Sequence, residues 1–405
     1  MKASALRLDD NVLPIVSVAG TRGKSTVSWM LIELLRAARV PTASWLSSGV
    51  YVDDERQEGE LGPWSRVVLA ARHGEIDVAI QEMSAATVVG AGLPEGAYPV
   101  VVLTTLCGNN DACLLNVETE LQRRALDIVI RSVRDDGLIV ANADDYDIAQ
   151  LAIDAQAACV LFALHRDNPA LQRHLANGGE GAWVEDGWVT VGGVGGGEPV
   201  VAVDEIPATL DGTILFQVQN ALAAICVARV IGVPVASLAN ALRRFEPRPD
   251  RQPAACNIVR FNGATILIDA PQQIMSLRML ARGIKHKPHR RTLVVSGSFP
   301  GLGDDEVQEA GRILGGLGGI ILLHSEQADT SRMAAIKAGI SSAAVPPIVL
   351  SVPDELRAID HLLNTIAPDD VALALADDPE TVLQHLWPAP VISVDASRKT
   401  GMVSR

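Results

Sequence analysis

The chain has 405 residues, of which 48% are apolar and 20% charged, and this composition excludes an intrinsically disordered protein. Its formal net charge of −14 argues against nucleic acid and anionic membrane surfaces as partners, because both are polyanions. The five cysteines include no CxxC pair, which predicts reduced thiols. No apolar stretch is long enough to cross a bilayer, and the N-terminal residues lack the apolar core of a signal peptide. We therefore expect a cytoplasmic protein.

Apolar runs of strand length alternate with helical patterns along the first part of the chain, which is typical of a mostly parallel α/β sheet with helices on both faces. Strands are predicted over residues 12–19, 76–81, 100–104 and 137–141, and helices over residues 25–38, 121–133, 220–231 and 235–242. The glycine-rich segment 178–197 is predicted to form an antiparallel hairpin at an edge of the first domain.

Residues 245–253 combine three prolines with four charges, which predicts a linker between domains. Beyond it the strand and helix alternation restarts, with a first strand at 264–268, a helix at 276–283 and a last strand at 371–376. We expect a larger domain at 1–247 with a P-loop and a mostly parallel sheet, and a smaller Rossmann-like α/β domain at 248–405.

The most specific motif follows the first predicted strand. Residues 20–25 read GTRGKS, and an amphipathic helix begins directly after them. Glycines allow backbone amides to surround an anion, the helix N-terminus adds its positive dipole end, Lys24 reaches β- and γ-phosphates, and the Ser25 hydroxyl suits Mg²⁺. This pattern predicts a nucleoside triphosphate site, although Val18 occupies the first glycine position of the longer P-loop consensus. The alternative is a tight strand-to-helix turn with an exposed lysine.

The loop GTRGKST resembles the ATP-binding loop of the Mur ligase superfamily, and its arginine resembles that of poly-γ-glutamate synthases. The cyanophycin synthetase family is similar over nearly the whole chain, including SSGVYV, IDVAIQEMSA, ANADD, FQVQNALAAICVARVIGVP and ILIDAPQQIMSLRML. This resemblance implies an ADP-forming ligase that uses ATP and Mg²⁺. Such enzymes convert a carboxylate to an acyl phosphate, which an amino-acid amine then attacks.

The resemblance also implies roles for individual residues. Lys24, Glu82, Asp111 and Arg251 would serve catalysis, and Ser25, Ser47, Ser48 and Glu82 would hold Mg²⁺. The nucleotide would contact Gly20, Thr21, Arg22, Gly23, Lys24, Ser25, Thr26, Gln217, Asn220, Arg251 and Asp269. Simpler interpretations stay open: a solvated strand end for Glu82, turn chemistry for the two serines, and a solvated linker arginine for Arg251. The ANADD turn is expected to be architectural.

Several departures from the family pattern favour a second hypothesis. The expected magnesium-binding histidine near residues 103–114 is missing, and Asp111 replaces at most the neighbouring aspartate. The helix that carries a carbamylated lysine in many relatives has no lysine here, and Asp127 lies near that position. The alternative is therefore a catalytically degenerate nucleotide-binding partner or scaffold. For the enzyme, the expected partner is a small amino-acid or peptide substrate. Assembly as a homo-oligomer or with another ligase component stays open.

Overall fold

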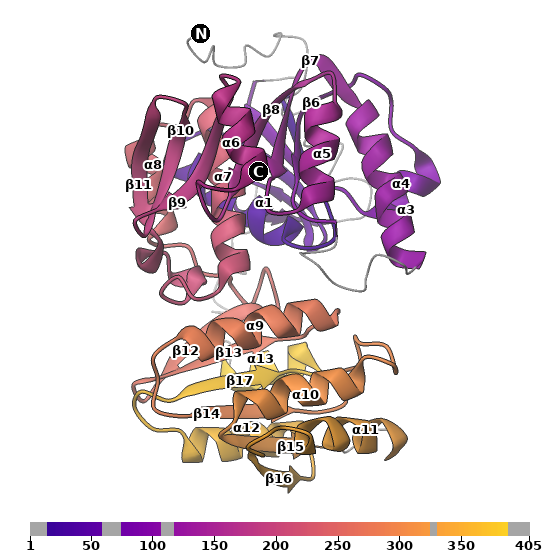
Figure 1. Cartoon of the computed structure of the whole chain (residues 1–405), viewed down its shortest axis with the longest axis vertical. Helices are drawn as coiled ribbons and strands as arrows, with labels where there is room; N and C mark the ends of the chain where they lie inside the picture. Colours follow the sequence, from indigo (N-terminus) through magenta and orange to yellow (C-terminus); the bar gives the residue numbers. More distant parts are fainter. Residues whose placement is uncertain (1–13, 59–73, 107–116, 325–329, 388–405) are drawn as a thin grey trace, which may run out of the picture. The chain divides into compact units, whose positions relative to one another are not determined.

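The computed structural model describes residues 14–58, 74–106, 117–324 and 330–387 (Figure 1). Its contacts divide the chain into two compact units, and α9 (Ile274–His286) groups with the first of them. Unit 1 comprises Met1–Gln252 and Gln273–Pro288, and unit 2 comprises Pro253–Gln272 and His289–Arg405. A domain boundary between residues 247 and 248 stays a prediction.

A single large sheet forms the centre of the described part of unit 1, in the order β11-β10-β9-β8-β7-β6-β1-β5-β2-β3-β4. Its parallel strands are β2 (Thr42–Leu46), β5 (Val78–Glu82), β1 (Ile15–Ala19), β6 (Tyr98–Leu103), β7 (Val133–Asn142), β8 (Ala158–Ala163) and β9 (Glu180–Glu185). Antiparallel strands extend both edges: β10 (Trp188–Gly193) and β11 (Gly196–Ala202) at one, β3 (Gly49–Val52) and β4 (Glu55–Gln57) at the other. The predicted hairpin in the glycine-rich segment is confirmed.

Helices cover both faces of this sheet because its central strands are apolar on both sides. In β6, Val100 and Val102 belong to one buried cluster, and Val101 and Leu103 belong to the other. The first cluster includes α1 (Lys24–Ala37), α7 (Leu215–Ile231) and α8 (Val235–Leu242). The second includes α3 (Ala85–Ala91), α4 (Val117–Arg131), α5 (Tyr146–Asp154) and α6 (Pro169–Ala176). Two short 3₁₀ helices, Val203–Glu205 and Pro207–Thr209, precede α7.

Unit 2 contains a second, smaller sheet with the order β12-β13-β17-β14-β15-β16. Its strands are β12 (Ala255–Phe261), β13 (Ala264–Asp269), β14 (Thr292–Ser296), β15 (Ile320–His324), β16 (Ile348–Val352) and β17 (Val371–Leu375), and all pairs except β12 with β13 are parallel. Its helices are α10 (Val307–Leu317), α11 (Thr330–Ser341), α12 (Glu355–Thr365) and α13 (Pro379–Leu386). The predicted fold class, a P-loop α/β domain with a smaller Rossmann-like α/β domain, is confirmed.

The turn after β7 has the architectural role expected for it. The Asn142 carboxamide oxygen accepts the Asp144 backbone N–H at 3.0 Å. Asp145 caps α5 by accepting the N–H of Ile148 at 3.3 Å, and it accepts the N–H of Leu106 at 2.8 Å. These bonds satisfy backbone donors at a helix start and at the end of a neighbouring strand. Among the described helices, none has both the length and the apolar character needed to cross a membrane.

Candidate functional site: a phosphate loop and its carboxylate

The predicted phosphate loop connects β1 to α1 and depends on two glycines with left-handed backbone conformations. Gly20 has φ +131° and Gly23 has φ +82°. A Cβ atom on Gly20 would lie 2.2 Å from the Thr104 hydroxyl, and one on Gly23 would lie 2.4 Å from the Asn220 carboxamide oxygen. Both the backbone conformation and the lack of space therefore require glycine at these two positions.

Two threonines that follow β6 support the loop, and the sequence analysis did not identify them. The Thr21 N–H donates to the Thr105 carbonyl at 2.7 Å, and the Thr104 hydroxyl donates to the Arg22 carbonyl at 2.6 Å. β6 pairs with β1, so the residues just after β6 reach the loop just after β1. A polar TT pair directly after an apolar strand was the available signal in the sequence.

The start of α1 is suited to an anion. Gly23 is the N-cap residue and makes no side-chain cap hydrogen bond, and the first turn of the helix contains no acidic residue. The backbone N–H groups of this turn are therefore not capped by their own N-cap side chain, and the helix dipole adds positive potential there. Lys24 folds back over the loop, where its ammonium donates to the Gly20 carbonyl at 2.8 Å. This arrangement fits phosphate oxygens.

Two further predicted nucleotide residues in the loop contact other segments of unit 1. The Arg22 guanidinium lies 3.4 Å from the Ser276 hydroxyl in α9. The Thr26 hydroxyl is buried in α1 and accepts a hydrogen bond from the Gln252 carboxamide at 3.1 Å. Residues distant in sequence thus hold both sides of the loop-helix junction in place.

Glu82 is the last residue of β5, next to β1 in the sheet, so its carboxylate reaches the start of α1. Its Oε2 accepts the Ser25 hydroxyl at 3.1 Å and the Ser47 N–H at 3.3 Å. Its Oε1 is buried and has no hydrogen-bond partner among the described residues. Burial raises the pKa of Glu82, and the hydrogen bonds from the two serines and the charge of Lys24 oppose that rise.

Ser47 and Ser48 form the two-residue turn between β2 and β3, whose flanking residues Leu46 and Gly49 are paired. The Ser47 hydroxyl lies 3.3 Å from the Ser25 hydroxyl. The Ser48 hydroxyl is buried without a hydrogen-bond partner in the described structure. The two serines therefore occupy a tight turn, as the simpler interpretation has it, and this turn also brings them to the phosphate loop.

The oxygen atoms gathered here fit a magnesium ion. Ser25, Ser47 and Glu82 present hydroxyl and carboxylate oxygens within hydrogen-bond distance of one another, and Glu82 Oε1 lacks a partner. Mg²⁺ typically takes one or two carboxylates and fills its remaining positions with water and substrate phosphates. No cluster of three or more His, Cys, Asp or Glu side chains suited to a metal occurs within the described ranges. Asp111 lies outside the described residues.

The residues predicted near the nucleotide base lie at the start of α7. Gln217 and Asn220 are both buried, and the Asn220 amide donates to the Gln217 carboxamide oxygen at 3.0 Å. Asn220 also lies directly against Gly23, as the close approach above shows. The start of α7 is thus adjacent to the phosphate loop.

Arg251 has different partners from those expected of a phosphate-binding residue. Its guanidinium lies 4.5 Å above the Trp29 ring, within 3.3 Å of the Glu33 carboxylate, and forms a second ion pair with Asp54. Arg251 is 8% exposed, and it joins Glu33 of α1 to Asp54 in the turn between β3 and β4. Its role toward ATP phosphates stays a prediction.

Asp269 belongs to unit 2, where it is the last residue of β13. Burial raises the pKa of its carboxyl group to about 6, although Cys256 donates a hydrogen bond to it at 3.2 Å. A carboxylate at the carboxyl end of a parallel strand is at the usual ligand-binding edge of an open α/β sheet. Its contact with ribose hydroxyls stays a prediction.

Comparisons with known proteins find relatives by sequence and by fold. No family model matches the chain. The chain is 27% identical over 297 residues to a cyanophycin synthetase of Geminocystis herdmanii, covering 73% of this chain and 34% of the relative. It is 25% identical over 382 residues to that of Trichormus variabilis, covering 91% of this chain and 41% of the relative. The chain thus spans about a third to two fifths of the length of these relatives.

Solved structures with the same fold are ligases. E. coli FolC in complex with DHPP and ADP superposes with a TM-score of 0.62 and 14% identity, covering 92% of this chain and 88% of that one. MurF ligase from Thermotoga maritima in complex with ADP gives a TM-score of 0.59 and 17% identity, covering 92% and 79% of the two chains. The chain is thus similar in sequence to cyanophycin synthetases over part of their length, and it shares the fold of MurF ligase and FolC.

Proposed function

We propose that the chain is an ATP-dependent, ADP-forming ligase that joins a carboxylate to an amino-acid amine. The observation that carries this proposal is the phosphate loop, in which two glycines of left-handed conformation place a lysine and an uncapped helix start beside a buried glutamate. The relatives named cyanophycin synthetase and the ADP-bound ligases of the same fold support the same chemistry.

In this proposal, the nucleotide phosphates bind at Gly20–Thr26. Lys24 and Arg22 neutralise phosphate charge, while Gln217 and Asn220 lie toward the base. Ser25, Ser47, Ser48 and Glu82 hold Mg²⁺, which supplies charge neutralisation for phosphoryl transfer. Asp269 of unit 2 binds ribose hydroxyls, and Arg251 and Asp111 complete the catalytic set.

The proposed reaction has two steps. A substrate carboxylate oxygen attacks the γ-phosphorus of ATP, and ADP leaves as an acyl phosphate forms. The amine nitrogen then attacks the acyl carbon, and the intermediate loses phosphate and a proton to leave the amide. The protein contributes positioning and charge rather than a nucleophile. This suits the sequence, which contains no nucleophile-elbow signature.

A second function is a catalytically degenerate nucleotide-binding partner of another ligase. The missing histidine near residues 103–114 favours it, and Asp127, near the position of the carbamylated lysine, is exposed on α4. Loss of one transition-state ligand typically reduces the rate by roughly 10²–10³. Nucleotide binding would survive such losses.

The test combines calorimetry with a coupled assay for ADP release across free amino acids and acidic peptides. We expect MgATP binding that Lys24→Ala weakens at least tenfold and that Lys337→Ala, an exposed lysine in α11, leaves unchanged. ADP release that depends on both a carboxylate and an amine supports the ligase. Binding without release supports the degenerate partner, and no nucleotide binding at all refutes both.

A further inference from the structure

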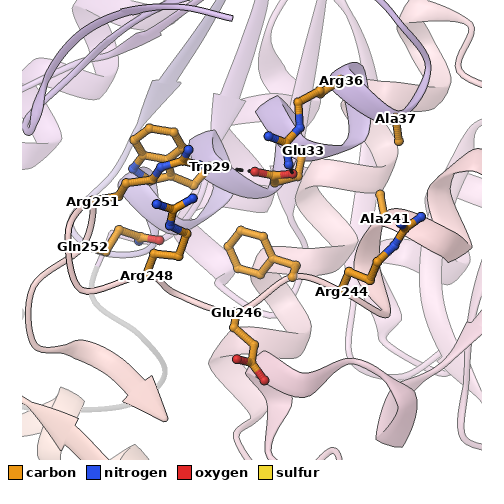
Figure 2. A pocket seen from close by; sticks show the side chains of 11 residues that line it. Trp29, Glu33, Arg36, Ala37, Ala241, Arg244, Glu246, Arg248, Arg251 and Gln252 are labelled. Atoms are coloured by element: carbon orange, nitrogen blue, oxygen red, sulfur yellow. Dashed lines mark hydrogen bonds and ion pairs between the residues drawn. The ribbon is translucent and has the colours of Figure 1, made fainter. Parts of the chain in front are cut away.

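A cavity of about 410 Å³ opens on unit 1 beside the later turns of α1 (Figure 2). Side chains from α1, from the end of α8 and from the segment Phe245–Gln252 line it. Its volume falls within the range of small-molecule pockets. Glu33 on its wall lies roughly 13 Å along the helix axis from Lys24, while Gln252, at the opposite end of the lining, donates a hydrogen bond to Thr26 in the first turn of α1.

The inner wall of the cavity is apolar and rigid. Trp29 is 2% exposed and Phe245 is 5% exposed, and Ala37 and Ala241 add small apolar surfaces. Trp29 is fixed by an edge-on contact with Tyr51, at 4.9 Å between ring centroids. The floor of the cavity is therefore packed, whereas its rim consists of exposed side chains such as Arg244, Glu246 and Arg248.

The lining carries four arginines against two glutamates, which is unusual in a chain with a net charge of −14. Arg251 and Arg36 are already paired with Glu33 and Asp54, and Arg248 is paired with Asp250, so Arg244 is the one of the four that forms no ion pair with a described residue. In Figure 2, the side chain of Arg248 lies near that of Arg251, and the Glu246 carboxylate is directed away from both.

Three groups at the cavity retain donors that the described residues do not use. The indole Nε1–H of Trp29 is buried and has no acceptor among the described residues. Arg244 uses its Nε to donate to the Asn240 carbonyl, and Arg248 uses Nε and one Nη to donate to Asp250. Their other guanidinium N–H groups make no hydrogen bond within the described chain. The Trp29 N–H is the buried donor of the three, and a buried donor without an acceptor is costly, whereas Arg244 and Arg248 are exposed and keep N–H groups available to a ligand.

We propose that this cavity binds a small organic anion through carboxylate or phosphate oxygens. Arg244 and Arg248 pair with the anionic oxygens, the Trp29 indole N–H donates to one of them, and Phe245 contacts the apolar part of the molecule. The inference uses only the geometry of the cavity, so it does not depend on the ligase activity proposed above.

The experiment measures binding in the Lys24→Ala background, which weakens the phosphate loop as a competing anion site. Inorganic phosphate and L-glutamate are the two probes, and they distinguish a phosphate from a carboxylate source. We expect saturable binding of one of them in calorimetry, accompanied by a rise in the unfolding temperature. Failure of both probes to bind up to tens of millimolar overturns the proposal, whatever MgATP does with the unmodified chain.

The variants assign the binding to the cavity. Arg244→Gln with Arg248→Gln should weaken binding at least tenfold, and Trp29→Phe, which keeps an aromatic though smaller ring and removes the N–H, should weaken it several-fold. Arg124→Gln, at an exposed arginine of α4 paired with Glu120, is the matched control and should bind normally. Circular dichroism verifies that each variant is folded. Binding that the double variant leaves unchanged places the anion elsewhere and refutes the proposal.

Discussion

Replacement of Gly23 by alanine tests whether the phosphate loop has the geometry described above. The φ angle of +82° costs an L-residue about 1–2 kcal/mol. The new Cβ would lie 2.4 Å from the Asn220 carboxamide oxygen, whereas ordinary contacts begin near 3.4 Å, so Asn220 must move by about 1 Å. That movement disrupts the hydrogen bond to Gln217, which contributes about 1 kcal/mol. Together these two terms predict that Gly23→Ala destabilises the native conformation of the loop by about 2–3 kcal/mol.

If the strain is relieved by rearrangement of the loop, MgADP affinity should fall by roughly 30-fold to 150-fold, as calorimetry can measure. A double-mutant cycle with Asn220→Ala separates the two contributions. Asn220→Ala itself removes the hydrogen bond to Gln217, so it should cost about fivefold in affinity on its own and almost nothing further in the Gly23→Ala background, where that bond is already lost. Wild-type affinity and unfolding temperature in Gly23→Ala would falsify this account of the loop.

Three further predictions concern carboxylates. Glu82→Gln keeps the shape of the side chain but removes its charge. Mg²⁺ should therefore improve the affinity for ADP much less than in the wild type, while metal-free ADP binding stays equal or improves. An undiminished effect of Mg²⁺ in calorimetry contradicts the metal assignment. Burial raises the pKa of Asp269 from 3.8 to about 6, so the folded state holds a proton that the unfolded state releases, and this group lowers stability as pH rises between those two values. Asp269→Asn should therefore raise the unfolding temperature at pH 7.5 and have little effect near pH 4. Equal effects at both pH values would refute the shift. Asp145→Ala removes the cap of α5 and the acceptor for the Leu106 N–H. Denaturant unfolding should show that the free energy of unfolding falls by about 2 kcal/mol. A fall of less than about 0.5 kcal/mol would contradict this role of Asp145.

The sequence was sufficient to predict those parts of the structure that depend on residues adjacent in the chain. The strand, glycine loop and helix at Ile15–Ala37 follow one another directly, so local pattern predicts both the elements and the loop between them. Glu82 was predictable for a related reason, because the apolar run before it identifies the end of a strand. The antiparallel strands β3, β4 and β12 were not predicted, and β3 and β4 are only four and three residues long, too short for an alternating pattern to be recognised.

The supports of the site could not be predicted because they come from residues distant in sequence. Thr104 and Thr105 reach the loop only because β6 lies beside β1 in the sheet. Arg251 pairs with Glu33 and Asp54, which lie about two hundred residues earlier and on two different elements. Nothing in a linker's composition specifies such partners, because ion pairs of this kind depend on the completed tertiary fold.

The grouping of α9 with unit 1 has a practical consequence for dissecting this protein. The polypeptide passes from one unit to the other after Gln252, after Gln272 and after Pro288. A single cut in the linker therefore cannot release either unit intact: truncation after Gln252 removes Ser276, which contacts the Arg22 guanidinium, and Lys287, which forms an ion pair with Asp211. Separate expression of the larger unit would need a circular permutation or a short bridge that restores Gln273–Pro288 to it.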